Sequence, residues 1–298
     1  MRLISKTVAA ALAVSFLLYG CASPSATTET GEWAPLFNGT DLTGWETYIG
    51  PDLDEDREKI PGSALGLNND TVGLFTIVEE DGEPAIRVSG ERGAGFNTVD
   101  EFENYHLRLE YKWGDETPWP WMSNMDSGLL YHAWGEHGVD NDYWKRSHEF
   151  QVMQTTTGDY IAIEGATGDI PTREEDGRYV FDPNGEMHTF SRGGFHPDGV
   201  SGAARIETSA DYPEADGRWT TVELYAVGDK AVHVVNGTVN MALENSRAYV
   251  DGEEWPLTRG QIQFQSEGAE LFYRNIEIRN IEEIPADILQ AAGLSEPM

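Results

Sequence analysis

The chain has little cysteine, little positive charge and none of several common catalytic motifs. Cys21 is the single cysteine among 298 residues, so an internal disulfide and a cysteine-based zinc site are both excluded. Lys and Arg number 20 against 52 Asp and Glu, and without clustered positive charge nucleic acid is excluded as a partner. The sequence also lacks a glycine-rich phosphate loop and a GxSxG elbow, which argues against nucleotide-hydrolase and serine-hydrolase functions.

The N-terminus has the pattern of an export signal. Two basic residues and then an apolar run occupy residues 1–20, and this run is too short to span a bilayer but typical of a signal peptide. Residues 18–21 (LYGC) resemble a lipobox, in which Cys21 is acylated and becomes the first mature residue. An ordinary secretory signal that leaves a free thiol is the alternative. We expect lipidation at Cys21, with residues 21–32 as a flexible tether to a membrane of the bacterial cell envelope, the outer membrane or cell surface.

Acidic residues dominate the remaining chain. The formal net charge is −32, and removal of the two basic residues of the signal peptide takes it to about −34. The acidic residues are scattered in short groups, such as DLDEDREK (residues 52–59) and REEDGR (residues 173–178), and form no single tail. This distribution predicts a solvated acidic surface of the kind common in proteins from salty water, and a functional role for the charge is the alternative.

Strand patterns recur along residues 33–281 and predict one large β domain. In HLRLEYKW, apolar residues alternate with polar ones, as in a half-buried antiparallel strand. Asn236 and Gly237 separate two such runs and favour a type I′ hairpin turn. Helical periodicity is confined to PADILQAAG (residues 285–293), within a C-terminal extension of residues 282–298. Many short strands with Gly and Pro between them indicate an all-β fold, a sandwich or jelly roll.

Side chains suited to proton transfer occupy one face of three predicted strands. The strands are SGLLYH (residues 127–132), HEFQVMQ (residues 148–154) and GQIQFQSEG (residues 260–268), and each has a two-residue period. His148 falls on the apolar face and is expected to be a hydrogen-bonded core histidine. The opposite face predicts a polar, concave floor, although a sheet face turned to bulk solvent is the alternative. The expected members of this floor are His132, Glu149, Gln151, Gln265 and Glu267.

Residues in the adjoining loops are further candidates. Trp134 and Trp144 lie between the first two of these strands, and indole rings beside a polar floor are suited to stacking on sugar rings, although Trp is also a common core residue. Arg192 and His196 lie in FSRGGFHPDG, whose glycines allow the backbone to approach a ligand closely, although a mobile surface loop is equally compatible. Lys145 precedes HEFQ and is expected either to bind substrate oxygen atoms or to pair with a nearby carboxylate.

Four segments together resemble one bacterial family. PLFNGTDLTGW, SGLLYH, EFQVMQ and IQFQSEGAELFYRNIEIR occur in the order found in the 3-keto-disaccharide hydrolase domain family, formerly a domain of unknown function. The resemblance covers residues 33–281 and implies a concanavalin-like β-sandwich. Family members are often exported lipoproteins of sugar-degrading bacteria, in agreement with the lipobox. The chain departs from the family at Ser266 and Glu267, where many relatives have a histidine before the glycine.

The resemblance implies cleavage of 3-keto glycosides or 3-keto disaccharides in carbohydrate breakdown. A ketone at C3 acidifies the C2 proton, so a base can remove this proton and the enolate can expel the C1 substituent. Addition of water then gives net hydrolysis, and its omission gives a lyase. We expect His132 and Glu149 to be the catalytic residues and to hold a divalent metal such as Mn, Co, Zn or Ca, with no organic cofactor. The expected substrate-binding residues are Gln151, Gln265, Glu267, Lys145, Arg192, His196 and Trp134.

Two other functions fit the same pattern. A glycan-binding, lectin-like lipoprotein would need the aromatic and amide residues, but it would have no use for His132 beside Glu149. Ordinary glycoside hydrolysis by two carboxylates, such as Glu149 and Glu267, would need the pair to flank a glycosidic bond at roughly 5 to 10 Å.

Overall fold

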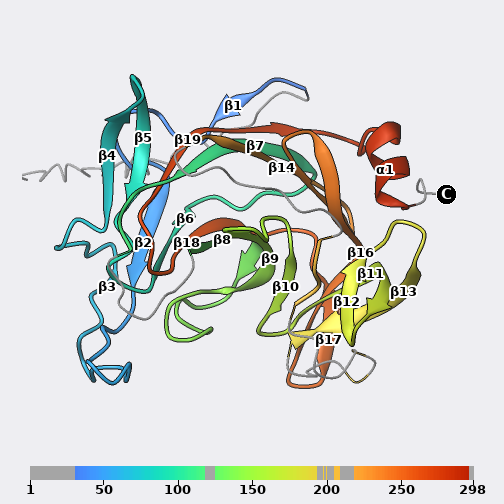
Figure 1. Cartoon of the computed structure of the whole chain (residues 1–298), viewed down its shortest axis with the longest axis horizontal. Helices are drawn as coiled ribbons and strands as arrows, with labels where there is room; N and C mark the ends of the chain where they lie inside the picture. Colours follow the sequence, from blue (N-terminus) through green and yellow to red (C-terminus); the bar gives the residue numbers. More distant parts are fainter. Residues whose placement is uncertain are drawn as a thin grey trace, which may run out of the picture.

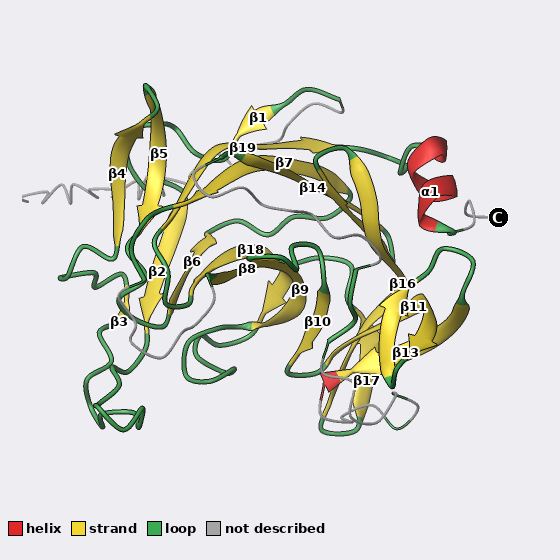
Figure 2. Cartoon of the chain, in the orientation of Figure 1, coloured by secondary structure: helices red, strands yellow, loops and turns green. Residues whose placement is uncertain are grey.

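Two antiparallel sheets pack face to face and account for almost all of the regular structure (Figure 2). The computed structural model describes residues 31–117, 125–192, 205–208 and 218–294, together with positions 197 and 199. The larger sheet arches over the smaller one in Figure 1, and its β11, β12 and β13 end lies beside β10 of the smaller sheet. The all-β sandwich predicted from the strand patterns is therefore confirmed.

The larger sheet has the strand order β12-β11-β16-β15-β14-β7-β19-β5-β4, with β1, β13 and β17 paired at its sides. Its twelve strands are β1 (Ala34–Pro35), β4 (Phe75–Glu80), β5 (Glu83–Val88), β7 (Tyr105–Trp113), β11 (Ala166–Glu175), β12 (Arg178–Phe181), β13 (Glu186–Ser191), β14 (Thr220–Val227), β15 (Lys230–Val235), β16 (Thr238–Val250), β17 (Glu253–Pro256) and β19 (Leu271–Asn280).

The smaller sheet has the order β10-β9-β8-β18-β6-β2-β3 and carries all three strands of the predicted floor. Its seven strands are β2 (Trp45–Ile49), β3 (Gly66–Leu67), β6 (Ala94–Thr98), β8 (Asp126–Trp134), β9 (Arg146–Met153), β10 (Tyr160–Ile163) and β18 (Gln261–Ser266). Because β8 lies between β9 and β18, segments more than a hundred residues apart in sequence become neighbours.

The hydrophobic core fills the space between the sheets. Leu129, Phe150 and Phe264 from the smaller sheet are at most 1% exposed, and they belong to the same buried cluster as Leu107 and Tyr111 from β7. Burial of one such side chain contributes about 1.5–3 kcal/mol relative to leaving it in water. Alternate residues of β8, β9 and β18 therefore anchor the sheet, and the residues between them point to its other side. We call that other side the open face, which carries Glu149, Gln151 and Gln265.

Two local predictions are confirmed. Asn236 and Gly237 connect β15 to β16 with φ angles of 48° and 79°, as a type I′ turn requires. The C-terminal helix α1 (Ala286–Ala292) is followed by Gly293 in the left-handed region, whose amide donates to the carbonyl of Gln290.

A β-bulge reverses the side chain of His132. The pairing of β8 with β9 shifts register between Tyr131 and Trp134, and His132 has a φ of 50°. Its ring therefore lies in the interior, edge-on to Tyr105 of β7, and its Nδ1 donates to the carbonyl of Leu257 at 3.1 Å. The expectation that His132 shares a face with Glu149 is wrong, because strict alternation fails at the inserted residue.

The predicted signal peptide, Cys21 and most of the tether lie outside the described residues, as does His196. Within the part of the chain that the structure describes, no helix has the length and apolar character needed to cross a bilayer.

Candidate active site

A cavity of about 270 Å³ opens on the open face of the smaller sheet. The floor comes from β8, β9 and β18, and the walls come from β10, the loop between β8 and β9, and the two arginines at the edge of the larger sheet. The lining residues are Asp126, Asp140, Asn141, Trp144, Glu149, Gln151, Ile161, Ile163, Arg192, Arg205, Gln265 and Glu267.

Gly128 allows the floor to form. It lies on β8 opposite Gln151 of β9, and a Cβ at this position would overlap Oε1 of Gln265 and Oε1 of Glu149. The two polar side chains therefore extend over the glycine from the strands on either side. A residue larger than glycine would displace both of them.

The loop between β8 and β9 closes one end of the cavity. The indole Nε1 of Trp144 donates to the carbonyl of Ala94 at 2.9 Å, and the Tyr143 hydroxyl donates to the carbonyl of Pro51 at 3.1 Å. These bonds fix the loop across β6 and β2. Trp144 and Tyr143 pack on Leu130, which separates the cavity from the polar residues further along the open face.

Two ion pairs hold the arginines of the cavity wall. Arg192 at the end of β13 donates through Nη1 to Oδ1 of Asp140 at 2.9 Å, and Asp140 is 3% exposed. Arg205 donates through Nε to Oδ2 of Asp159, which also accepts the backbone amide of Thr208 at 2.7 Å. Each arginine is therefore held by a buried carboxylate while its guanidinium group lines the cavity.

Three carboxyl groups in the cavity have no ion-pair partner among the described residues: Asp126, Glu149 and Glu267. Burial raises the pKa of Asp126 to about 7, against which the charge of Arg205 acts. Burial also raises the pKa of Glu149 and of Glu267 well above the usual range, and the negative charges of neighbouring carboxylates, Asp126 foremost, add to this rise. Like charges in a desolvated pocket therefore favour a state in which some of these groups keep their protons.

This arrangement supplies both halves of acid–base chemistry. A carboxylate whose pKa lies near neutrality can accept a proton, and a neutral carboxyl beside it can donate one. The guanidinium groups of Arg192 and Arg205 offer further donors toward oxygen atoms of a ligand. The cavity can thus remove a proton from carbon, stabilise the resulting negative charge and protonate a leaving group.

The structure brings five of the predicted site residues together and places three others elsewhere, while His196 lies outside the described residues. Glu149, Gln151, Gln265, Glu267 and Arg192 all line the cavity, as predicted from their alternation and loop position.

Three predicted residues lie elsewhere. His132 is in the core, because the β-bulge in β8 reverses its side chain. Lys145 lies beyond Trp144, where its ammonium group donates to Oε1 of Gln261 at 2.7 Å, and burial lowers its pKa. Trp134 packs against the buried cluster that contains Leu257. Lys145 and Trp134 do not line this cavity, because the fixed loop and the bulge carry them away from it, and a role of either residue in substrate binding stays a prediction.

The sequence interpretation missed several lining residues. Asp126 directly precedes SGLLYH and continues its alternation by one residue, so an extended strand would have included it. Trp144, which the sequence indicates as a candidate for stacking on a sugar ring but not as a substrate-binding residue, also lines the cavity. Asp140 and Arg205 come from segments without strand periodicity, and only the tertiary fold places them at the cavity.

His148 is a hydrogen-bonded core histidine, as predicted. The Ser246 hydroxyl donates to the carbonyl of Leu257 at 2.6 Å and accepts from Nε2 of His148 at 2.7 Å. Nδ1 of His148 therefore accepts from the Tyr160 hydroxyl at 2.8 Å. Burial lowers the pKa of His148 well below its usual value and that of His132 to about 4, so both rings are neutral at pH 7.

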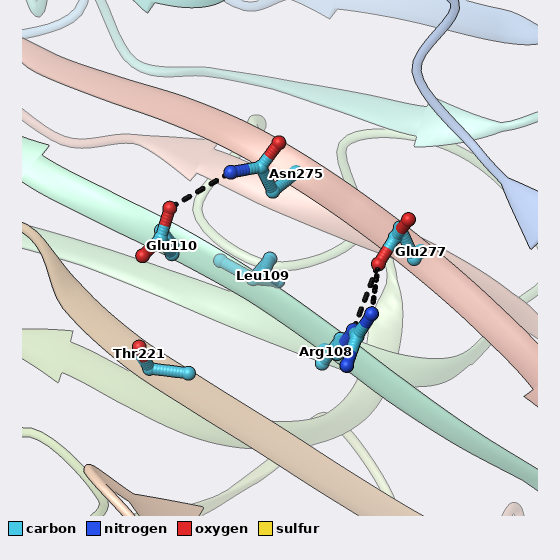
Figure 3. Close-up of a pocket in the computed structure, with 6 residues that line it drawn as sticks. All are labelled: Arg108, Leu109, Glu110, Thr221, Asn275 and Glu277. Carbon is cyan, nitrogen blue, oxygen red and sulfur yellow. Dashed lines mark hydrogen bonds and ion pairs between the residues drawn. The ribbon is translucent and has the colours of Figure 1, made fainter. Parts of the chain in front are cut away.

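A larger cavity, of about 400 Å³, lies on the outer face of the larger sheet between β7, β14 and β19 (Figure 3). Nε of Arg108 donates to Oε2 of Glu277 at 2.8 Å, and Nδ2 of Asn275 donates to Oε2 of Glu110 at 2.9 Å. The charged groups of this cavity pair with one another, so it lacks the unpaired carboxyl groups that distinguish the cavity on the open face.

Residues 32–279 match the family model of the 3-keto-alpha-glucoside-1,2-lyase-like domain. The chain belongs to this family. The family resemblance read from the four sequence segments is confirmed, and all lining residues of the open-face cavity fall within the matched range. No curated protein matches the chain.

Solved structures with similar folds are distant in sequence. A putative glycosyl hydrolase from Parabacteroides distasonis is 16% identical, with a TM-score of 0.47, and the match covers 84% of this chain and 94% of that one. A carbohydrate-binding module from Bacillus subtilis is 10% identical, with a TM-score of 0.40, and the match covers 69% of this chain and 92% of that one. At these scores the similarity adds nothing to the family match.

Proposed function

We propose that this protein cleaves 3-keto glycosides or 3-keto disaccharides at the open-face cavity. Membership of the 3-keto-alpha-glucoside-1,2-lyase-like family supports the reaction class. The observation that carries the proposal is the group of three carboxyls, Asp126, Glu149 and Glu267, that share one desolvated pocket and have no ion-pair partner among the described residues. Such a group destabilises a folded protein and is not needed to bind neutral hydroxyls, which makes a catalytic role the better explanation.

Asp126 is the proposed base, because a pKa of about 7 allows its carboxyl group to ionise near neutral pH. Its carboxylate takes the C2 proton of the 3-keto sugar, and the C–H electron pair moves toward the C3 oxygen to form an enolate. The guanidinium groups of Arg192 and Arg205 stabilise this negative charge. The enolate then reforms the ketone, a C1–C2 double bond forms, and the C1–oxygen bond breaks.

Glu149 is the proposed acid. Burial and the neighbouring carboxylates raise its pKa well above the usual range, which favours its neutral form, and its proton goes to the departing C1 oxygen. Release of the unsaturated sugar at this stage gives a lyase. Addition of water across the C1–C2 double bond gives net hydrolysis.

The divalent metal expected from the sequence does not fit this pocket. His132 and Glu149 point to opposite faces of the smaller sheet, so they cannot share an ion. In the described part of the chain, no three His, Cys, Asp or Glu side chains are arranged to hold a metal. The mechanism above therefore assigns each step to residues of the chain.

One assay separates this proposal from its alternatives. The purified protein is incubated with a plain disaccharide and with the same disaccharide oxidised at C3, and products are followed by chromatography. Cleavage of the 3-keto form alone supports the proposal. Cleavage of the plain form supports two-carboxylate hydrolysis by Glu149 and Glu267, which share the cavity. Binding of either sugar without cleavage supports the lectin-like function and overturns the proposal.

We also propose that the mature protein is held on a membrane of the cell envelope through acylated Cys21. The lipobox and the position of the single cysteine support this proposal. Replacement of Cys21 by Ala should move the protein from the membrane fraction to the soluble fraction without changing its activity. A variant that stays in the membrane fraction would refute the anchor.

A further inference from the structure

The cavity on the open face has an excess of hydrogen-bond acceptors. Besides the three carboxyl groups without ion-pair partners, Oε1 of Gln151 and Oε1 of Gln265 have no hydrogen-bond partner among the described residues, and these two residues are 4% and 1% exposed. Oδ1 of Asp126 is likewise without a partner. Buried acceptors without donors are unfavourable, so a ligand that supplies donors or positive charge gains more here than one that supplies acceptors.

One carboxyl group is surplus to the proposed reaction. Proton removal and proton return need two carboxyls, Glu149 and Asp126, and Glu267 has neither task. Glu267 lies just after β18, two residues from Gln265, and both side chains line the cavity. Neither arginine forms an ion pair with Glu267, because Arg192 is paired with Asp140 and Arg205 with Asp159, and the charge of Arg192 offsets only part of the rise in the pKa of Glu267.

Three kinds of ligand can be compared at this position. A metal ion needs carboxylates that converge on one point, and the described residues do not provide such a set. An anionic sugar, such as a uronate, would add a negative charge to a pocket that already holds unpaired carboxyls in a chain of net charge −32. An ammonium group brings three donors and a positive charge, and its hydrogen bonds of about 2.8 Å require less convergence than metal coordination.

We propose that the sugar bound here carries a protonated amine, and that Glu267, with the amide oxygen of Gln265, forms the ammonium subsite. This inference rests on the proposed function for one premise, that the ligand is a sugar. Glu149 and Asp126 remain available for proton transfer. The substrate class is therefore amino-sugar glycosides in preference to neutral ones, and neutral ones in preference to uronates.

Calorimetric binding of three methyl glycosides tests the subsite without any cleavage. The probes are methyl glucosaminide, methyl glucoside and methyl glucuronide, which share a ring shape and differ in charge. We expect the glucosaminide to bind about tenfold more tightly than the glucoside, and the glucuronide to bind more weakly than either. Equal affinity for the first two, or no binding of any probe at millimolar concentration, overturns the inference.

A matched pair of variants assigns the effect to Glu267. Glu267→Gln keeps the shape and removes the charge, so the preference for the glucosaminide should fall to within about threefold. Glu277→Gln removes a carboxylate on the outer face and should leave the preference unchanged. Circular dichroism confirms that each variant is folded. An unchanged preference in folded Glu267→Gln overturns the assignment.

The two proposals fail in different ways. Cleavage of a neutral 3-keto glycoside by a protein that shows no preference for the amine overturns the ammonium subsite and leaves the proposed function intact. A preference for the amine without cleavage of any 3-keto glycoside leaves the subsite intact and overturns the proposed function.

Discussion

The cavity on the outer face and the cavity on the open face lie on opposite sides of the sandwich and differ in how their charges are paired. On the outer face, Arg108 pairs with Glu277 and Asn275 with Glu110 (Figure 3). On the open face, Asp126, Glu149 and Glu267 have no ion-pair partner among the described residues, although that cavity is the smaller one, at about 270 Å³ against about 400 Å³. Size therefore does not identify the candidate site, whereas uncompensated polar groups do.

The difference also concerns stability. Paired charges on an exposed sheet face contribute little to folding and cost little. Unpaired carboxyls in a desolvated pocket destabilise the folded chain, and proteins commonly retain such groups where a reaction needs them. The following substitutions test this contrast, beginning with the largest expected effect.

Glu149→Gln should reduce turnover of a 3-keto glycoside by at least about a hundredfold, the usual scale for loss of a general acid. The substitution keeps the shape of the side chain, so the unfolding transition should be retained. Steady-state kinetics on the folded variant measure the effect. Activity close to that of the wild type would remove Glu149 from the proposed chemistry.

Asp126→Asn should lower activity but stabilise the fold at pH 8. The expected gain in the free energy of unfolding is about 2–4 kcal/mol, because burial raises the pKa of Asp126 from 3.8 to about 7 and each pKa unit corresponds to about 1.4 kcal/mol. The folded pKa is higher than the unfolded one, so the ionised form destabilises the native state above pH 7. As pH falls through 7 toward 4 the native state takes up the proton, and the advantage of the variant should disappear. Urea unfolding at pH 8 and pH 4 measures both values. A variant less stable than the wild type at pH 8 would contradict the claim that the unpaired carboxyl groups of the open-face cavity destabilise the fold.

Gly128→Ala should reduce turnover by at least about tenfold, because the added methyl group displaces Glu149 and Gln265 from their positions over β8. The matched control is Gly237→Ala in the β15–β16 turn, where a Cβ meets no neighbouring atom. The control has a strained φ of 79° and is expected to lose stability without losing turnover per folded molecule. Equal turnover in the two folded variants would mean that the floor does not depend on Gly128.

Glu277→Gln should have the smallest effect. Its partner Arg108 is 44% exposed, so loss of the ion pair should lower the free energy of unfolding by less than about 1 kcal/mol, and turnover should not change. Thermal unfolding and kinetics at low and moderate salt measure this. A large loss of activity would give the outer cavity a role that its paired charges do not suggest.

The alternation of polar and apolar residues in the sequence is enough to predict much of the floor of the open-face cavity. Glu149, Gln151 and Gln265 were assigned to one face because β9 and β18 keep a strict two-residue period through them. His132 was misplaced because the extra residue of a β-bulge gives no signal in the polar and apolar pattern. Asp140 and Arg205 could not be predicted, because their positions depend on buried partners that come together only in the folded chain.

The regular alternation of β9 has a consequence for how this protein can evolve. Phe150 supports the core and Glu149 serves the cavity, and they are adjacent in the chain. Deletion or insertion of one residue within β9 would exchange their sides, placing a carboxylate in the hydrocarbon interior and a phenyl ring in the cavity. New specificities in this lineage should therefore arise through point substitutions at floor positions, such as Glu267, and through length changes in the loops around the cavity, while the length of β9 stays constant.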